Sequence, residues 1–232
     1  MQMLMSGPSG PTHSSPQQPA CGEAAAAARG VDRLGRAEAR ARHLVERVFR
    51  GRADWWLHGP PTMLTGMVDL ATTARMTAEE YLEWERRQPG KHEFHRGEVF
   101  AMAGGSPRHN YLSNALGAEL RAGLRSRGCH VLSSDQRISA AAGERYVYAD
   151  VVVVCGELRT DPKGPDILSN PAVVVEILSP GTEIYDRGAK WDAYQRLPSL
   201  ADYLLVAQDG ARIEHYRRQA DGSWRYRLHE TG

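Results

Sequence analysis

Cysteine is scarce in this sequence, and long apolar runs are absent. The three cysteines, Cys21, Cys129 and Cys155, lie far apart in a chain of 232 residues, which is too few and too scattered for a disulfide framework or a zinc site. We expect them to be small buried residues of a protein in the reducing cytoplasm. No apolar run approaches the roughly 18–20 residues of a membrane-spanning helix, and the Pro-, Gly-, Ser- and Gln-rich N-terminus lacks the apolar stretch of a signal peptide. The sequence therefore predicts a cytoplasmic location and no membrane partner.

The chain also lacks a strong charge of either sign, since its formal net charge is +1. Residues 1–75 contain 9 Lys and Arg against 6 Asp and Glu, whereas residues 76–232 contain 20 against 22, a net charge of −2. A nearly neutral domain produces no overall basic field that would attract nucleic acid. Any binding of DNA would therefore depend on a local patch.

The composition changes along the chain and predicts two parts. Residues 1–70 begin with a Pro- and Ser-rich stretch and an alanine run, which bury too little apolar surface to offset the entropy of ordering. We expect them to form a disordered or weakly helical extension. Later methionines such as Met63, Met67 and Met76 leave open that the extension results from a misassigned start. Residues 71–232 are predicted to form the folded domain.

The first half of this domain contains clear helix and hairpin signals. Thr77 to Glu80 form a capping box, which predicts a short helix ending near Arg87. The segment from His92 to Ala103 is typical of a hairpin that turns at Arg96 and Gly97. Leucines spaced by four after Ser106 predict a longer helix that ends at Gly128.

The second half contains two continuous valine-rich runs, Val147 to Cys155 and Ala172 to Leu178. Each is short and bounded by turn residues, which predicts strands buried on both faces of a sheet. A helix from about Arg187 to Arg196 is expected to follow. Further short strands are predicted around Cys129–Ser133, 136–140, 203–207, 213–217 and 224–228. The fold class is therefore α/β, a mixed sheet flanked by helices.

Two acids, Asp150 and Glu176, interrupt the two valine-rich runs. A carboxylate inside an apolar strand costs several kcal/mol unless it is paired, hydrogen-bonded or bound to a metal. One such acid is explained by a structural partner, but two on strands expected to be neighbours favour a shared cation. Oxygen ligands of this kind suit Mg²⁺ or Mn²⁺. Zinc is disfavoured because neither Cys nor His lies nearby in the sequence.

Several segments match a known family in order and spacing. They are Glu93-Phe-His-Arg-Gly-Glu98, Ser106-Pro-Arg-His109, Ala149-Asp-Val-Val-Val-Val154, Val173-Val-Val-Glu-Ile-Leu-Ser-Pro180, Asp186-Arg-Gly-Ala-Lys190, Tyr194 and Leu197-Pro-Ser-Leu-Ala-Asp-Tyr203. With these segments the stretch from Thr77 to Gly222 resembles the Uma-two family, a branch of the PD-(D/E)XK nuclease superfamily. The resemblance implies a restriction-endonuclease-like fold and a metal-dependent endonuclease activity.

The resemblance also implies a role for individual residues. Asp150 would be the metal-binding aspartate, Glu176 the acid of the (D/E)XK element, and Glu93 the acid that completes the metal site. Two positions depart from the superfamily pattern, because Ala149 stands where the signature has proline and Leu178 where it has lysine. In the family the lysine is moved onto the following helix, which assigns that catalytic role to Lys190.

Three of these residues also have plainer interpretations. Lys190 would otherwise be a solvated helix lysine that pairs with Asp186, four residues earlier. Tyr194, one turn after Lys190, is an accessory candidate but also a typical core aromatic. His109 could contact a phosphate or the attacking water, or simply lie on the surface of the first helical turn.

The sequence thus predicts an endonuclease that hydrolyses phosphodiester bonds with Mg²⁺ or Mn²⁺. The resemblance favours DNA as the nucleic-acid partner and allows a homodimer. One alternative is a non-catalytic interaction module with the same fold, which the near-neutral charge supports. Another is a structural role in which arginines such as Arg108, Arg145 or Arg187 satisfy both acids.

Overall fold

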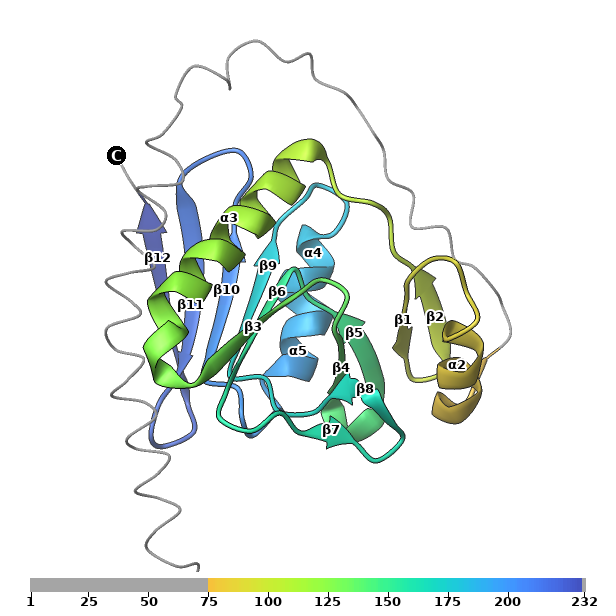
Figure 1. Cartoon of the computed structure of the whole chain (residues 1–232). Helices are drawn as coiled ribbons and strands as arrows, with labels where there is room; N and C mark the ends of the chain where they lie inside the picture. The colour runs from red at the N-terminus through yellow and green to blue at the C-terminus, as the bar shows by residue number, and fades with distance from the viewer. Residues whose placement is uncertain (1–74, 231–232) are drawn as a thin grey trace, which may run out of the picture.

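The computed structural model describes residues 75–230, so the extension predicted over residues 1–70 lies outside the described residues. The described chain forms two six-stranded sheets with helices between and around them (Figure 1). Sheet A has the strand order β2-β1-β5-β4-β8-β7, and sheet B has the order β12-β11-β10-β9-β6-β3. Each sheet contains one parallel pair, β4 with β8 and β9 with β10, and is otherwise antiparallel. The predicted mixed α/β class is confirmed, with two sheets instead of one.

The elements have the following bounds. The helical segments are α2 (Ala78–Glu85), α3 (Pro107–Leu124), η2 (Arg125–Arg127), η3 (Ala141–Gly143), α4 (Glu183–Tyr185), η4 (Asp186–Lys190) and α5 (Trp191–Tyr194). The strands of sheet A are β1 (His92–His95), β2 (Glu98–Ala101), β4 (Arg137–Ala140), β5 (Arg145–Tyr148), β7 (Thr160–Asp161) and β8 (Gly164–Leu168). Those of sheet B are β3 (Cys129–Ser133), β6 (Val151–Cys155), β9 (Val173–Ile177), β10 (Asp202–Val206), β11 (Arg212–Arg218) and β12 (Trp224–Glu230).

Three apolar cores pack the two sheets and the helices against one another. Helix α3 crosses one face of sheet B (Figure 1) and packs through Leu112 and Leu116. The opposite face of sheet B packs against α5 and the inner side of sheet A in a core that includes Val174, Tyr194 and Val147. Helix α2 covers the outer face of sheet A. The central strands β6 and β9 of sheet B are therefore buried on both faces, and α5 lies in the layer between the two sheets.

The helix signals read from the sequence are confirmed. The capping box of α2 is formed by Thr77 and Glu80 in both directions, with distances of 2.7 and 3.2 Å. The side chain of Ser106 caps α3, and Gly128 ends the η2 turn that follows α3 in the left-handed conformation that glycine tolerates best. None of the helices within residues 75–230 is long and apolar enough to cross a membrane.

Strand β9 also follows the prediction. Val173, Val175 and Ile177 pack into the α3 core, whereas Val174 and Leu178 pack into the core between the sheets. Because side chains alternate along a strand, Glu176 points to the same side as Val174, toward sheet A and α5. Glu176 therefore shares its face of β9 with Val174 and Leu178.

The run from Val147 to Cys155 was wrongly predicted to be one continuous strand. The chain leaves sheet A at Tyr148 and enters sheet B at Val151, so Ala149 and Asp150 form a corner between the sheets. A run of apolar residues cannot reveal this break, because both halves are buried. Asp150 therefore lies at a corner and outside any strand.

Other differences concern the helix after β9 and the connection before it. The predicted helix from Arg187 to Arg196 begins earlier, at Glu183, and includes the π-helical segment η4. Strands β7 and β8 were not predicted. The second of them includes the polar sequence Gly164-Pro-Asp166, which lacks the valine-rich signal of a buried strand.

The prediction for two of the cysteines is wrong. Cys129 and Cys155 are directly opposite each other on the antiparallel strands β3 and β6 and form a disulfide. The pairing depends on strand register, which brings together residues separated by 26 positions in the sequence. Cys155 is exposed and not buried as expected. Cys21 lies outside the described residues.

Candidate active site

The ammonium group of Lys190 lies at the centre of a buried cluster of acids. Its Nζ atom is 3.1 Å from Oε1 of Glu176, 3.3 Å from Oε1 of Glu93 and 3.3 Å from Oδ1 of Asp186. All four side chains are at most 6% exposed. We call these four residues the Lys190 cluster.

Three layers of the fold contribute to the Lys190 cluster. Glu176 comes from β9 of sheet B, and Glu93 from β1 of sheet A. Phe94, the next residue of β1, packs into the α2 core, so strand alternation turns Glu93 to the inner face of sheet A. Lys190 and Asp186 belong to the π-helical segment η4 between the sheets, and π-helical turns are frequent at functional sites.

Two neighbours fix the orientation of these side chains. The backbone amide of Tyr148 donates a hydrogen bond to Oε1 of Glu93 at 3.0 Å, and Nζ of Lys190 donates to the Tyr148 carbonyl at 3.0 Å. The hydroxyl of Tyr194 donates to Oε1 of Glu176 at 3.1 Å. Both the strand end of β5 and helix α5 therefore position the cluster.

The electrostatics of the cluster are unbalanced. Burial raises the pKa of Glu176 well above its ordinary value, although the charge of Lys190 opposes this. Burial alone would lower the pKa of Lys190, but Glu176, Glu93 and Asp186 together raise it well above its ordinary value. One cation thus faces three carboxyl groups in a place from which water is largely excluded.

Asp150 lies next to the cluster at the corner between the sheets. Val151 pairs with Val175 in the antiparallel β6–β9 register, so one further step places Asp150 opposite Glu176. Oδ2 of Asp150 accepts a hydrogen bond from the amide of Ile177 at 2.7 Å and lies 3.1 Å from Nε2 of His109. The charge of Asp150 also contributes to the raised pKa of Glu176.

The structure thus brings the predicted residues together in two groups. Glu93, Glu176, Lys190 and Tyr194 make direct contacts, whereas Asp150 and His109 contact each other beside them. The solvated interpretation of Lys190 is wrong, because the pair with Asp186 exists but is buried.

Asp186 was not predicted as a site residue. Its position four residues before Lys190 was a signal of pairing, but the sequence did not show that this pair would be enclosed between two sheets.

The interpretation in which arginines satisfy both acids does not describe this site. Arg187 pairs with Glu214 at 2.6 Å and with Glu183 at 3.2 Å. Arg145 donates to the carbonyl of Ala189. The cation that compensates Glu176 is a lysine, and Asp150 is held by a backbone amide and a histidine.

The chemistry of the acids fits a hard divalent cation. Asp150, Glu176 and Glu93 supply carboxylate oxygens, the ligands preferred by Mg²⁺ and Mn²⁺, and the excess of negative charge around Lys190 favours a further cation. Within residues 75–230, no three His, Cys, Asp or Glu side chains already form a group that could hold a metal ion. No histidine lies near either acid in the sequence, but the fold brings His109 into contact with Asp150.

Comparisons with known proteins identify the family and the fold. Residues 78–232 match the model of the Uma2 family, which is described as "Putative restriction endonuclease". A crystal structure from Anabaena variabilis, described as "a putative nuclease belonging to DUF820", superposes with a TM-score of 0.55 at 14% sequence identity. The match covers 67% of this chain and 85% of that protein, and it shows a common fold.

Two relatives from Synechocystis sp. are similar in sequence, and both are uncharacterized proteins. One is 39% identical over 150 residues, which are 65% of this chain and 78% of the relative. The other is 35% identical over 158 residues, which are 68% of this chain and 89% of the relative. With two thirds of its length matched by the family model, the chain belongs to the Uma2 family.

Proposed function

We propose that this protein is a divalent-metal-dependent endonuclease that hydrolyses phosphodiester bonds in DNA. The observation that carries the proposal is the Lys190 cluster, in which one buried ammonium faces the carboxyl groups of Glu93, Glu176 and Asp186. Buried charges are costly unless they are compensated, and strongly perturbed groups of this kind concentrate at functional sites. The family description and the common fold with a protein described as a nuclease support this proposal.

Asp150, Glu176 and Glu93 would hold the ion, with Mg²⁺ or Mn²⁺ as the natural choice for carboxylate ligands. When bound, such an ion lowers the pKa of a coordinated water and polarises the scissile phosphate. Asp150 lies at the corner just before β6, one step beyond the Val151–Val175 pair and opposite Glu176 of β9, so the two carboxylates are held at the same edge of the β6–β9 pairing.

Lys190 and Tyr194 act on these acids and on the substrate. Lys190 is held in place by the Tyr148 carbonyl, so that its ammonium orients the nucleophile or neutralises the charge that develops on the phosphoryl oxygens. Tyr194 donates to Glu176 and thereby fixes the rotamer of this ligand. Water is largely excluded from the cluster, which strengthens these electrostatic interactions.

A nuclease assay tests the proposal. Plasmid, linear and single-stranded DNA and RNA are incubated with the full chain in Mg²⁺, in Mn²⁺ and in EDTA. We expect cleavage of DNA that requires the ion, and its loss in Glu176→Ala and in Asp150→Ala, with Glu157→Ala, an exposed carboxylate, as the matched control. Metal-dependent cleavage that survives in either site variant would refute this assignment.

A non-catalytic module with the same fold is the second candidate, because residues 76–232 carry a net charge of −2 and productive DNA binding usually needs several basic contacts to phosphate. Calorimetric titration with Mn²⁺ separates the two. Binding that is lost in Glu176→Ala supports the nuclease, whereas a wild-type protein that binds no Mn²⁺ supports the module.

A further inference from the structure

Helix α3 holds Asp150 through two residues that are one helical turn apart. Nε2 of His109 lies 3.1 Å from Oδ2 of Asp150, and Oγ of Ser113 donates to the Asp150 backbone carbonyl at 3.2 Å. The amide of Ile177 donates to the same Oδ2 atom at 2.7 Å. The two contacts to the Asp150 carboxylate, from His109 and from the Ile177 amide, both involve Oδ2. Oδ1 is therefore the carboxylate oxygen that is left to bind an ion.

The position of His109 is itself fixed relative to strand β9. Its backbone amide donates to Oγ of Ser106 at 3.1 Å, and this hydroxyl donates to Oε1 of Gln208 at 3.1 Å. The amide group of Gln208 then donates to the carbonyl of Leu178 at 2.7 Å. The start of α3 is thereby tied to the end of the strand that carries Glu176.

The imidazole ring of His109 is packed closely against Gly105. A Cβ atom at position 105 would lie only 2.7 Å from Nδ1 of His109, which is too close for an unshifted ring. Nδ1 is buried and has no hydrogen-bond partner among the described residues. A buried polar atom without a partner costs free energy, and an apolar side chain of similar size would avoid this cost. An imidazole that bears this cost points to a role for Nε2, the atom that faces Asp150.

We infer that His109 is a positioning residue of the metal site, which fixes the carboxylate of Asp150 so that Oδ1 faces the divalent ion. The inference rests on the proposed function, because it assigns His109 to the same site. In protein metal sites, the hydrogen-bond partners of a ligand orient it, and their loss weakens metal binding by roughly 10–100-fold.

Calorimetric titration of the full chain with Mn²⁺ tests the inference in the variants His109→Leu and His109→Gln. Leucine removes the donor. The side-chain amide nitrogen of glutamine can occupy the place of Nε2 and donate to Asp150. We expect a 10–100-fold weaker affinity for Mn²⁺ in His109→Leu and an affinity close to that of the wild type in His109→Gln. Circular dichroism confirms that the variants are folded.

A second pair of variants displaces the ring without removing a polar group. Gly105→Ala places a methyl group against Nδ1 of His109, whereas the Cβ of Gly104→Ala meets no atom within 4 Å. We expect Gly105→Ala to weaken Mn²⁺ binding and Gly104→Ala to leave it unchanged. This pair keeps the test valid even if His109→Leu fails to fold.

The outcomes separate this inference from the proposed function. If the wild type binds no Mn²⁺, both are overturned. If the wild type binds Mn²⁺ and His109→Leu binds it equally well, the positioning role is overturned and the proposed function stands. If His109→Gln is as weak as His109→Leu and the spectrum of bound Mn²⁺ shows coupling to a nitrogen, His109 is a direct ligand, which overturns the positioning role.

Discussion

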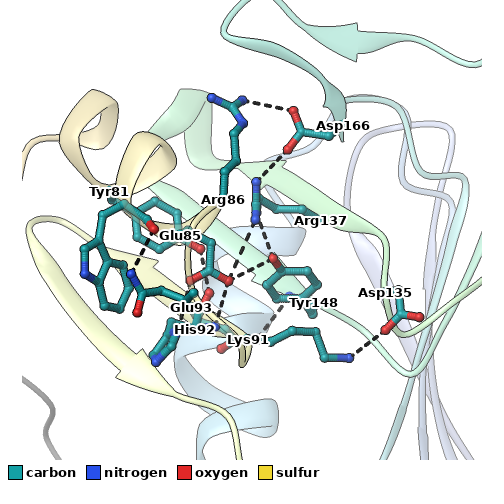
Figure 2. A network of polar contacts seen from close by, with 12 residues as sticks. Tyr81, Glu85, Arg86, Lys91, His92, Glu93, Asp135, Arg137, Tyr148 and Asp166 are labelled. Carbon is teal, nitrogen blue, oxygen red and sulfur yellow. Dashed lines mark hydrogen bonds and ion pairs between the residues drawn. The ribbon is translucent and has the colours of Figure 1, made fainter.

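Two polar clusters meet at Tyr148, one through its backbone and one through its side chain. The backbone amide and carbonyl of Tyr148 contact Glu93 and Lys190 of the Lys190 cluster. Its hydroxyl accepts from Nε of Arg137 at 2.9 Å and donates to Oε1 of Glu85 at 3.1 Å. We call the second cluster the Glu85 network, which consists of Glu85, Arg86, His92, Arg137, Tyr148 and Asp166 (Figure 2).

The two clusters differ in their balance of charge. In the Glu85 network, the carboxylates of Glu85 and Asp166 face the guanidinium groups of Arg137 and Arg86, with contacts of 2.8 to 3.7 Å. Glu85 also accepts from the backbone amide of His92 at 2.9 Å. In the Lys190 cluster, one ammonium faces three carboxyl groups. A network with balanced charges stabilises the fold, whereas uncompensated buried acids favour the binding of a further cation.

Removal of the single cation from the unbalanced cluster should have the largest effect. In Lys190→Met the carboxyl groups of Glu93, Glu176 and Asp186 lose their buried partner, and breaking a buried ion pair in this way costs about 3–5 kcal/mol. Urea unfolding in EDTA measures this loss. Added Mn²⁺ should restore part of the lost stability, because the ion supplies the missing positive charge.

Lys163→Met is the matched control for Lys190→Met. Lys163 pairs with Glu79 at 2.8 Å, but its side chain is 38% exposed, and exposed pairs contribute about 0–1 kcal/mol. If Lys190→Met is as stable in EDTA as Lys163→Met, the expectation is contradicted. The acids of the Lys190 cluster would then be compensated by something other than Lys190.

Loss of a carboxylate from the balanced network should have a smaller effect, confined to stability. Glu85→Gln weakens the contacts with Arg137, His92 and Tyr148 but keeps a side-chain oxygen that accepts hydrogen bonds, so we expect a total loss of about 1.5–3 kcal/mol, the contribution of one hydrogen bond to a charged group. We expect a lower free energy of unfolding and an unchanged affinity for Mn²⁺. The control is Glu83→Gln on the same helix, whose side chain is 76% exposed. A reduced Mn²⁺ affinity in Glu85→Gln would show that the network belongs to the metal site.

The sequence singled out three of the four residues of the Lys190 cluster but missed Asp186. The acids Asp150 and Glu176 stood out because each interrupts a valine-rich run. The family resemblance added Glu93 and Lys190, which no local pattern connects. The corner at Asp150 was missed, since two buried strands in different sheets have the same apolar signature as one strand.

Contacts between distant segments could not be predicted from local patterns. The Cys129–Cys155 disulfide depends on the register of β3 with β6. The Glu85 network depends on the packing of α2 against sheet A, and nothing in the spacing of Glu85 and Arg137 indicates that they meet. Helix caps and strand alternation are local and were correct, whereas pairing across sheets is a property of the whole fold.

The pH dependence of stability should also distinguish the clusters. Burial raises the pKa of Glu176, opposed by Lys190 and supported by Asp186, Asp150 and Glu93. The folded state therefore binds the Glu176 proton more tightly than the unfolded state. This contribution to stability is fully present below the pKa of Glu176 in the unfolded state. It is lost as the pH rises through the raised pKa of Glu176 in the folded state.

Glu176→Gln, which resembles the protonated acid, tests this sign. In EDTA, the wild type should lose stability relative to Glu176→Gln as the pH rises above the ordinary pKa of a glutamate toward the raised pKa of the folded state, as followed by urea unfolding at each pH. Saturating Mn²⁺ should oppose the loss, because the ion stabilises the ionised carboxylate. A stability difference that does not change with pH would contradict the unbalanced electrostatics of the cluster.

The smallest effect is expected for Tyr148→Phe, which tests whether the two clusters are independent. The variant removes the hydroxyl shared by Arg137 and Glu85 but keeps the backbone groups that contact Glu93 and Lys190. Because Arg137 keeps Asp166 and Glu85 keeps His92 as partners, the loss should be about 1 kcal/mol by urea unfolding. Affinity for Mn²⁺ and DNA cleavage should equal those of the wild type. If Mn²⁺ affinity falls as well, the hydrogen bonds of the Tyr148 hydroxyl help to position the metal site. The two clusters are then energetically coupled.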